Sequence, residues 1–368
     1  MTGPAFTIEP LHVPTSLDAP DAADFRDAIA VRNVVDELGY GSTDFVYTAE
    51  EALPRWQPNP HAPMEGFIAR LDGRVVARAA WETRQGEGAT TAWLDVRVHP
   101  ETRGRGIGTA LADHLETLAV ERGATKAIIY VVSPPAPGPT LESPTGFGAV
   151  PRGNPEVRFL LGRGYRLEQV ERASRIPLPF DADTVERLYR DTVATAGDDY
   201  RVVLWRERTP DRWLEDMAML LTRMSTEAPS AGLEEPEDVW TVERLVDEET
   251  RTASGGRLSL TAAVEHVPTG RLAGFTELVT PTDLSRPVSQ EDTLVLRAHR
   301  GHRLGMPLKL ANLRHLAEVR PGHPAVTTFN AEENRHMLDV NEAVGFVPVA
   351  SEGAWRKDFA ADGGSSAA

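Results

Sequence analysis

The feature that most constrains this 368-residue chain is a stretch that occurs twice, at a constant offset of 197 residues. Residues 95–108 recur as residues 292–305, and the shared positions are Asp95/Asp292, Val98/Val295, Arg103/Arg300, Gly104/Gly301 and Gly108/Gly305. The same offset aligns residues 73–77 with residues 270–274, and both read as a tight turn that leads into a strand. Two separate matches at one offset predict a tandem duplication, so both halves should adopt one fold.

Each half has the same predicted order of elements. A first strand (6–11 or 200–205) is followed by helical segments, a hairpin around Gly73 or Gly270, a strand into a glycine-arginine loop and a helix out of it. A further strand (125–132 or 325–329) and a short helix ending at 164–165 or 345–346 complete the half. This order predicts the α/β (α+β) class.

The predicted domain boundaries follow from the repeat. We expect a first domain over residues 1–180, a helical connector over 181–199 and a second domain over 200–359. The Gly/Ser/Ala tail at 360–368 is predicted to be disordered. A proline-rich insert at 134–151, which only the first half contains, is predicted to be a loop.

The helices that follow the two loops carry different apolar stripes. The first has Leu111, Leu115 and Leu118, and the second has Met306, Leu310, Leu313 and Ala317, which are out of register with the first set. We therefore expect the two helices to bury different faces.

Charge and cysteine content exclude several classes of function. The formal net charge is −16, which disfavours nucleic acid and anionic membranes and suits a cationic partner. The chain has no cysteine, so it has no disulfide, thiolate metal site or cysteine nucleophile. No apolar run approaches the roughly 18 residues of a membrane span. We expect a soluble, cytoplasmic monomer or homodimer with no metal site.

The repeated loop has the composition of an anion-binding site. A helix N-terminus offers unpaired N–H groups and a partial positive charge, and glycines let a ligand approach the backbone. Arg103 and Arg105 add positive charge in the first half, as do Arg300, His302 and Arg303 in the second. A basic surface turn is the alternative, disfavoured because the loop occurs twice in an acidic protein. Neither loop has the glycine spacing of a dinucleotide fold or a P-loop.

The first loop resembles a known family signature. Arg103-x-x-Gly106-x-Gly108 is similar to the (Gln/Arg)-x-x-Gly-x-(Gly/Ala) motif of the GNAT acyl-CoA N-acyltransferases, and Arg300-x-x-Arg303-x-Gly305 is a variant of it. Arginine at position 303 is compatible with the loop if its φ is negative. The resemblance implies two GNAT domains, arranged as in mycothiol synthase. Each would be an open V-shaped mixed sheet flanked by helices that binds acetyl-CoA and transfers its acetyl group to an amine.

Cofactor-binding residues follow from this resemblance and from the loops. In the first half they are Val96, Val98, Arg103, Gly104, Arg105, Gly106, Ile107, Gly108 and Thr109. In the second half they are Leu294, Val295, Arg300, Gly301, His302, Arg303, Leu304, Gly305, Met306, Asn330 and Asn334. The resemblance implies that Asn334 contacts the pantetheine arm, and helix capping is the alternative for both asparagines.

Three carboxylates are candidates for the acid–base chemistry. Asp292 and Glu277 in the second half, and Asp95 in the first, lie on strands near the loops and could take a proton from an amine or bind it as a cation. The alternative is a solvated carboxylate at a strand end. The tyrosine that many family members use as general acid is replaced by Leu160 and Asn341. A thiol of pKa about 8.5 can leave without it.

We favour the second half as the catalytic one, because its asparagine-containing segment is not interrupted by an insert. The expected function is acetyl transfer from acetyl-CoA to a primary amine of a small cationic acceptor, such as an aminoglycoside or another specialised metabolite. A mycothiol-synthase-like enzyme is one alternative. A non-catalytic acyl-CoA sensor is another, kept open by the missing tyrosines.

Overall fold

The computed structural model describes residues 6–86 and 90–359, which form two compact units. Unit 1 holds the described residues up to Val170 together with Ser230–Pro236 and the residues from Ser351 on. Unit 2 holds Glu171–Pro229 and Glu237–Ala350. The predicted tail at 360–368 lies outside the described residues.

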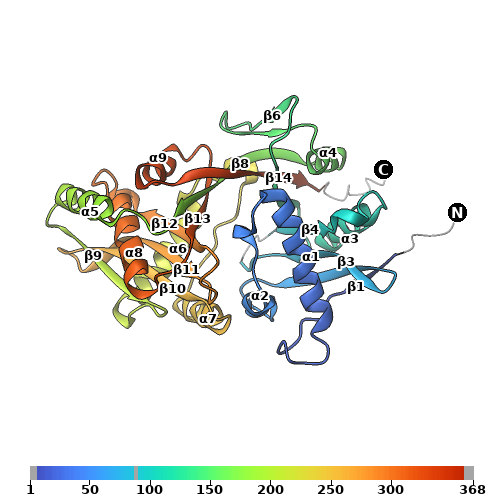
Figure 1. Ribbon diagram of the computed structural model, residues 1–368, viewed down its shortest axis with the longest axis horizontal. Helices are drawn as coiled ribbons and strands as arrows, with labels where there is room; N and C mark the ends of the chain where they lie inside the picture. Colours follow the sequence, from blue (N-terminus) through green and yellow to red (C-terminus); the bar gives the residue numbers. More distant parts are fainter. Residues whose placement is uncertain (1–5, 87–89, 360–368) are drawn as a thin grey trace, which may run out of the picture. The chain divides into compact units, whose positions relative to one another are not determined.

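Unit 1 is built on a mixed sheet of strand order β1-β2-β3-β4-β5-β14 (Figure 1). Its strands are β1 (Phe6–Pro10), β2 (Met64–Leu71), β3 (Arg74–Glu82), β4 (Thr91–Val98), β5 (Lys126–Val132) and the end of β14 (Val347–Asp358). Its helices are α1 (Ala23–Tyr40), α2 (Ala49–Trp56), α3 (Ile107–Glu121) and α4 (Pro155–Gly162). All neighbouring strands are antiparallel except β4 and β5, which are parallel.

Unit 2 repeats this arrangement with strand order β9-β10-β11-β12-β13-β8. Its strands are β9 (Tyr200–Arg206), β10 (Leu258–His266), β11 (Arg271–Thr280), β12 (Val288–Val295), β13 (Ala325–Ala331) and the end of β8 (Arg166–Pro177). Its helices are α5 (Ala182–Ala196), α6 (Leu214–Glu227), α7 (Val242–Ser254), α8 (Gly305–Val319) and α9 (Arg335–Val344). Again only the β12–β13 pair, which matches β4–β5, is parallel.

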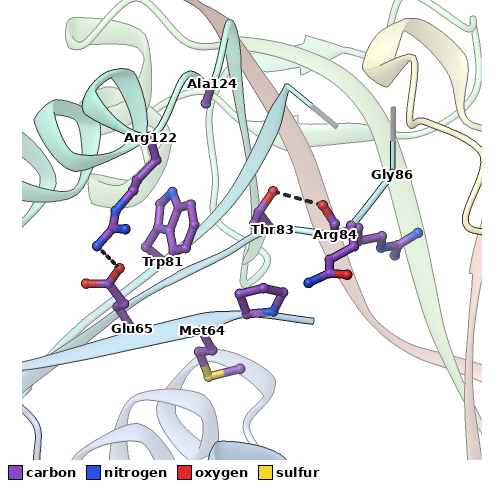
Figure 2. A pocket seen from close by; sticks show the side chains of 10 residues that line it. Met64, Glu65, Trp81, Thr83, Arg84, Gly86, Arg122 and Ala124 are labelled. Atoms are coloured by element: carbon purple, nitrogen blue, oxygen red, sulfur yellow. Dashed lines mark hydrogen bonds and ion pairs between the residues drawn. The ribbon is translucent and has the colours of Figure 1, made fainter. Parts of the chain in front are cut away.

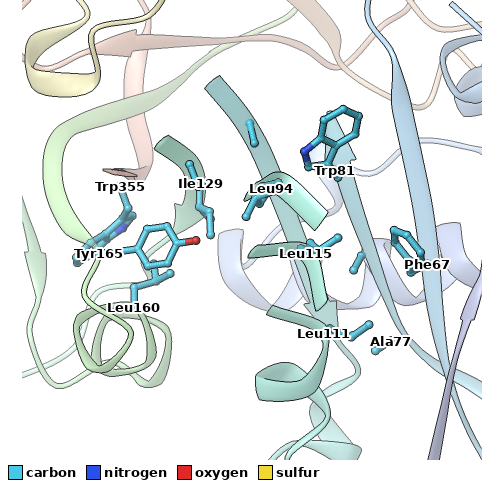
Figure 3. Close-up of a cluster of buried hydrophobic side chains, with 14 of the residues drawn as sticks. Phe67, Ala77, Trp81, Leu94, Leu111, Leu115, Ile129, Leu160, Tyr165 and Trp355 are labelled. Carbon is cyan, nitrogen blue, oxygen red and sulfur yellow. The ribbon is translucent and has the colours of Figure 1, made fainter. Parts of the chain in front are cut away.

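The two halves of the sequence exchange their last strands. β8 follows α4 in the first half, yet its residues 171–177 pair with β13 of unit 2. β14 ends the second half, yet its residues 352–358 pair with β5 of unit 1. Trp355 of β14 is consequently 1% exposed in the core of unit 1, beside Tyr165 and Leu160 (Figure 3). Unit 1 therefore depends on the C-terminal end of the chain.

Alternation along the strands gives unit 1 a core on each face of its sheet. Ala77 and Ala79 of β3 contribute to the cluster that holds Leu111 and Leu115 of α3, whereas Ala80 contributes to the cluster under α1 and α2. The same alternation directs Val96 and Val98 of β4 toward α3. Asp95 and Arg97, which alternate with these two valines along the strand, therefore face α1.

Two local expectations are corrected. The insert at 134–151 contains a small hairpin of β6 (Thr140–Glu142) and β7 (Ala149–Pro151), which forms because Val150 is buried in the core of unit 1. Helix α8 does not bury a different face from α3. The buried positions Ile107, Leu111, Ala112 and Leu115 recur as buried Leu304, Leu308, Lys309 and Asn312.

A second face of α8 is buried as well. Leu310 and Leu313 join a cluster with Val185 of α5, with Leu188 of the same helix packed against it. The connector helix therefore covers α8, whereas α3 keeps an exposed outer face. In the described part of the chain, no helix is long and apolar enough to cross a membrane.

Candidate cofactor and acceptor site

A cavity of about 600 Å³ opens where β4 and β5 of unit 1 separate. The two strands pair only from Thr91 to Trp93, opposite Lys126 to Ile128, and then diverge. The cavity is lined by Val96 and Val98 of β4, Ile129 and Val131 of β5, the loop and first turns of α3, and Phe159 and Leu160 of α4. A slot with apolar walls between splayed strands, opening at a helix N-terminus, suits a long thin ligand with an anionic end.

The loop at the mouth of this cavity has the backbone of an anion cradle. Gly104 and Gly106 have φ of +77° and +82°, and a Cβ built on either would meet no atom within 4 Å. Arg103 holds the turn, because its Nε donates to the carbonyl oxygen of Val98 at 3.2 Å. Within residues 6–86 and 90–359, neither Arg103 nor Arg105 is engaged in an ion pair. Both guanidinium groups are therefore available to a phosphate.

The second loop has a similar backbone, but its Arg300 is already paired with a carboxylate. Arg300 Nε donates to the carbonyl oxygen of Val295 at 3.1 Å, as in the first loop, while its Nη2 contacts Glu227 at 2.6 Å. Tyr200 donates to or accepts from His299 Nδ1 at 3.0 Å, and its ring lies 5.0 Å from that of His302.

The backbone of Arg303 differs from the negative φ expected for an arginine at this position. Its φ is +56°, not negative, so it occupies the left-handed region that Gly106 occupies in the first loop. A non-glycine residue there costs about 1–2 kcal/mol. The second loop therefore keeps the shape of the first at an energetic cost.

One position that lines the cavity of unit 1 is occupied by a lysine in unit 2. Ala112 lines the cavity, and the residue at the equivalent position of α8 is Lys309. Lys309 is 2% exposed, with its Nζ 6.0 Å from the ring centroid of Phe346. Burial lowers the pKa of Lys309 to about 7. Its side chain therefore takes up space that the smaller alanine leaves free in unit 1.

The two asparagines predicted to bind cofactor make contacts within unit 2. Asn334 caps α9, since its Oδ1 accepts a hydrogen bond from the Met337 N–H at 3.4 Å, which is the capping alternative. Asn330 Oδ1 accepts a hydrogen bond from Asn341 Nδ2 at 2.6 Å. Asn341 itself is 1% exposed at the position of Leu160.

Comparison with known proteins agrees with this geometry. Residues 37–136, which include β4, the first loop, α3 and β5, match the model of the acetyltransferase (GNAT) family. A solved tandem GNAT protein from the clavulanic acid biosynthesis pathway is 25% identical, with a TM-score of 0.71, over 97% of this chain and 100% of that one. Residues 37–136 are thus a GNAT domain, and the chain as a whole is similar to a tandem GNAT protein. It is accordingly an acyltransferase of the GNAT type.

Other comparisons extend the likeness of fold only. A GCN5-related N-acetyltransferase from Sphaerobacter thermophilus is 16% identical, with a TM-score of 0.60, over 96% of each chain. No curated protein matches the sequence. The predicted fold class, two GNAT domains that each hold a mixed sheet flanked by helices, is confirmed.

Asp95 of this GNAT protein is held between two arginines. Its Oδ2 accepts from Arg78 Nη2 and its Oδ1 contacts Arg97 Nη1, each at 2.5 Å. These two guanidinium groups outweigh the effect of burial and hold the pKa of Asp95 at about 2. A carboxylate that binds protons so weakly is a poor base at neutral pH, so its position supports a structural role.

Glu277 lies in the opposite electrostatic environment. It is half-buried on β11 of unit 2, and burial together with the nearby carboxylates of Glu291 and Asp292 raises its pKa to about 8. The Ser259 hydroxyl is its hydrogen-bond partner. The structure thus brings Glu277 and Asp292 together in unit 2, apart from the cavity of unit 1.

We predict that Glu277 makes stability fall as pH rises. Between its ordinary pKa of 4.5 and about 8, the folded state binds the proton more tightly than the unfolded state, so the free energy of unfolding declines across this window. Glu277→Gln should remove part of that decline and be about 2 kcal/mol more stable than wild type at pH 8.5, with little difference at pH 4.5. Urea unfolding across pH measures this. A wild-type curve parallel to that of the variant would contradict the assignment.

Two residues next to the cavity wall, Tyr40 of α1 and Glu352 of β14, were not among the predicted site residues. The Tyr40 hydroxyl donates to Glu352 Oε1. Glu352 is the cross-strand partner of Val132, which lines the cavity. No motif marks Glu352, because only the strand exchange brings it next to β5.

A second hollow, of about 420 Å³, opens by Trp81 in unit 1 (Figure 2). Met64 and Glu65 of β2 and Ala124, which precedes β5, contribute to it, and Arg122 contacts Glu65 across it. Because Ala124 directly precedes β5, this hollow lies at the start of that strand. Val132 and the larger cavity lie at the other end of β5. We therefore place the cofactor in the larger cavity.

Proposed function

We propose that this GNAT protein is an acetyl-CoA-dependent N-acetyltransferase that binds acetyl-CoA in the cavity of unit 1. The observation that carries the proposal is the cavity itself, which joins an apolar slot between splayed strands to a glycine loop. The two arginines of that loop form no ion pair with any residue that the structure describes. This reverses the preference for the second half that the asparagines suggested.

The residues of unit 1 fit the cofactor. Gly104 and Gly106 leave open space where side chains would stand, so backbone N–H groups at the start of α3 can reach a pyrophosphate. Arg103 and Arg105 would neutralise its charge. Val96, Val98 and Phe159 would contact the apolar part of the arm. In unit 2, Glu227 pairs with Arg300, and the longer side chain of Lys309 is buried at the position of Ala112, which supports unit 1 as the binding half.

The splayed strands also supply the chemistry expected of the protein. Bound acetyl-CoA would bring a thioester whose carbonyl oxygen gains negative charge during transfer. Beyond Trp93 the edge of β4 no longer pairs with β5, so backbone N–H groups on that edge can stabilise this charge. Leu160, in the place of the family's tyrosine, lines the cavity and can donate no proton, so the thiolate would take its proton elsewhere.

The acceptor we propose is a primary amine of a small cationic specialised metabolite, such as an aminoglycoside. A net charge of −16 favours cationic ligands. The neighbour named for the clavulanic acid pathway supports specialised metabolism as the setting. A monomer or homodimer remains our prediction for the assembly.

The proposal is tested by following CoA release from acetyl-CoA with spermidine, kanamycin A, glucosamine and lysine as acceptors. We expect saturable turnover with at least one of these amines and an acetylated product of the corresponding mass. Tight acetyl-CoA binding without CoA release for any amine would contradict the transferase and favour a binding protein.

A further inference from the structure

The C-terminal strand brings a carboxylate next to a wall of the cofactor cavity. Glu352 lies on β14 opposite Val132 of β5, the last residue of that strand and part of the cavity wall. Glu352 is half-buried, so part of its side chain remains accessible.

Helix α1 holds this carboxylate in place from its last turn. Gly39 packs so closely on β5 that a Cβ there would lie 2.3 Å from Val132 Cγ1. That contact places the next residue, Tyr40, over Glu352, to which its hydroxyl donates a hydrogen bond. Stacking on Phe45, with ring centroids 4.1 Å apart, fixes the tyrosine ring. Two elements of unit 1 therefore orient a carboxylate supplied by the end of the chain.

We propose that Glu352 is the group that binds the acceptor ammonium and takes its proton, and that Tyr40 positions it. This inference rests on the proposed function and names the residue that handles the amine at the same site. None of the three carboxylates favoured by the sequence occupies this place. Asp95 is paired with arginines, and Glu277 and Asp292 belong to unit 2.

The charges around Glu352 are compatible with this role. Arg97 of β4 and Arg32 of α1 face it together with Asp36 of α1, and the arginines and the Tyr40 hydroxyl lower its pKa. Burial is the largest influence on Glu352 and, together with Asp36, it outweighs the arginines and the tyrosine. The net effect raises the pKa of Glu352 above its usual range. A carboxylate with a raised pKa is a stronger base at neutral pH than an exposed one.

The proton and electron balance is complete with acetyl-CoA as the only co-reactant. Glu352 takes one proton from the ammonium, and the neutral nitrogen bonds to the acetyl carbonyl carbon. The carbon–sulfur bond breaks with its electron pair on sulfur, and the second nitrogen proton ends on the thiolate. The products are the amide and the free thiol, and Glu352 returns its proton to water.

The test compares full-length wild type, Glu352→Gln and Tyr40→Phe, with acetyl-CoA and the four amines named above. In wild type we expect kcat to rise with pH as Glu352 loses its proton. For Glu352→Gln we expect a kcat at least about 100-fold lower than that of wild type, without this rise. The Kd of acetyl-CoA should change by no more than about twofold. Tyr40→Phe should keep most of the activity but move that rise to higher pH, because the lost hydrogen bond favoured the carboxylate. Asp358→Asn, a carboxylate change at the other end of β14, should leave all three quantities unchanged.

Each outcome decides between the two proposals. Wild-type turnover that Glu352→Gln retains, with the same pH profile, overturns the assignment of Glu352 and leaves the transferase standing. Acetyl-CoA binding without CoA release by wild type overturns both. A turnover loss in Glu352→Gln that comes with an equal loss of acetyl-CoA affinity also overturns the assignment, because it shows a structural role.

Discussion

Gly106→Val is expected to weaken acetyl-CoA binding by about 100-fold, which corresponds to about 2.7 kcal/mol. The φ of Gly106 is +82°, a conformation that a β-branched residue adopts only with considerable strain. The loop would rearrange to relieve that strain, and the N–H groups before α3 would no longer converge on one anion. Calorimetric titration with acetyl-CoA measures the change.

Two controls separate cofactor binding from general destabilisation. Gly73→Val places valine at a φ of +78° in the β2–β3 turn, where a Cβ also meets no atom within 4 Å. It should cost similar stability and leave the Kd unchanged. Arg303→Gly relieves strain in the second loop and should stabilise the protein by about 1 kcal/mol without adding a binding site, because Lys309 remains. Equal loss of affinity in Gly106→Val and Gly73→Val would contradict the site.

Asp95→Asn is expected to lower the free energy of unfolding by about 3 kcal/mol. The substitution leaves Arg78, which is 6% exposed, and Arg97 without the carboxylate that they share. The wild-type carboxylate contributes its stability above its ordinary pKa of 3.8 and loses it as pH falls through about 2. The difference between wild type and variant should therefore be constant at neutral pH and shrink toward pH 2.

The matched control is Asp21→Asn, which removes an exposed carboxylate that contacts His12 at 2.8 Å. It should change stability by less than about 0.5 kcal/mol. Urea unfolding at several pH values measures both variants. An Asp95→Asn protein of wild-type stability that binds acetyl-CoA normally but has lost turnover would restore Asp95 as a catalytic residue.

The duplication and the loops could be predicted because they depend on local sequence. The 197-residue offset aligns the hairpin turns, strand β4 with β12 and even the Arg103 and Arg300 contacts to the preceding strand. Glycines with positive φ and a helix N-terminus carry their chemistry in a few consecutive residues. The motif was thus sufficient to place the start of α3 and its family.

The exchange of β8 and β14 could not be predicted in this way. Either strand can complete either sheet as far as its alternation of side chains shows, and only tertiary packing decides the partner. Trp355 reads as an ordinary strand residue, yet it is buried in unit 1. The catalytic assignment to Glu352 depends on this long-range pairing, so no search for local motifs would have found it.

The sheet-facing side of α8 was predicted wrongly for a related reason. Lys309 and Asn312 are polar residues that occupy buried positions of α8, so the apolar stripe followed Leu310 and Leu313, which pack beneath α5. Counting apolar residues therefore traced the contact with the connector helix instead of the sheet-facing side. Of the asparagines that favoured the second half, Asn334 caps α9 and Asn330 accepts a hydrogen bond from Asn341.

Hydrogen–deuterium exchange of the full-length protein, with and without saturating acetyl-CoA, tests most directly the claim that unit 1 holds the cofactor. We expect slower exchange of amides over residues 96–98 and 103–112, with no change over residues 294–295 and 300–309. Protection confined to residues 300–309, with residues 103–112 unaffected, would contradict the account and place the cofactor in the second half.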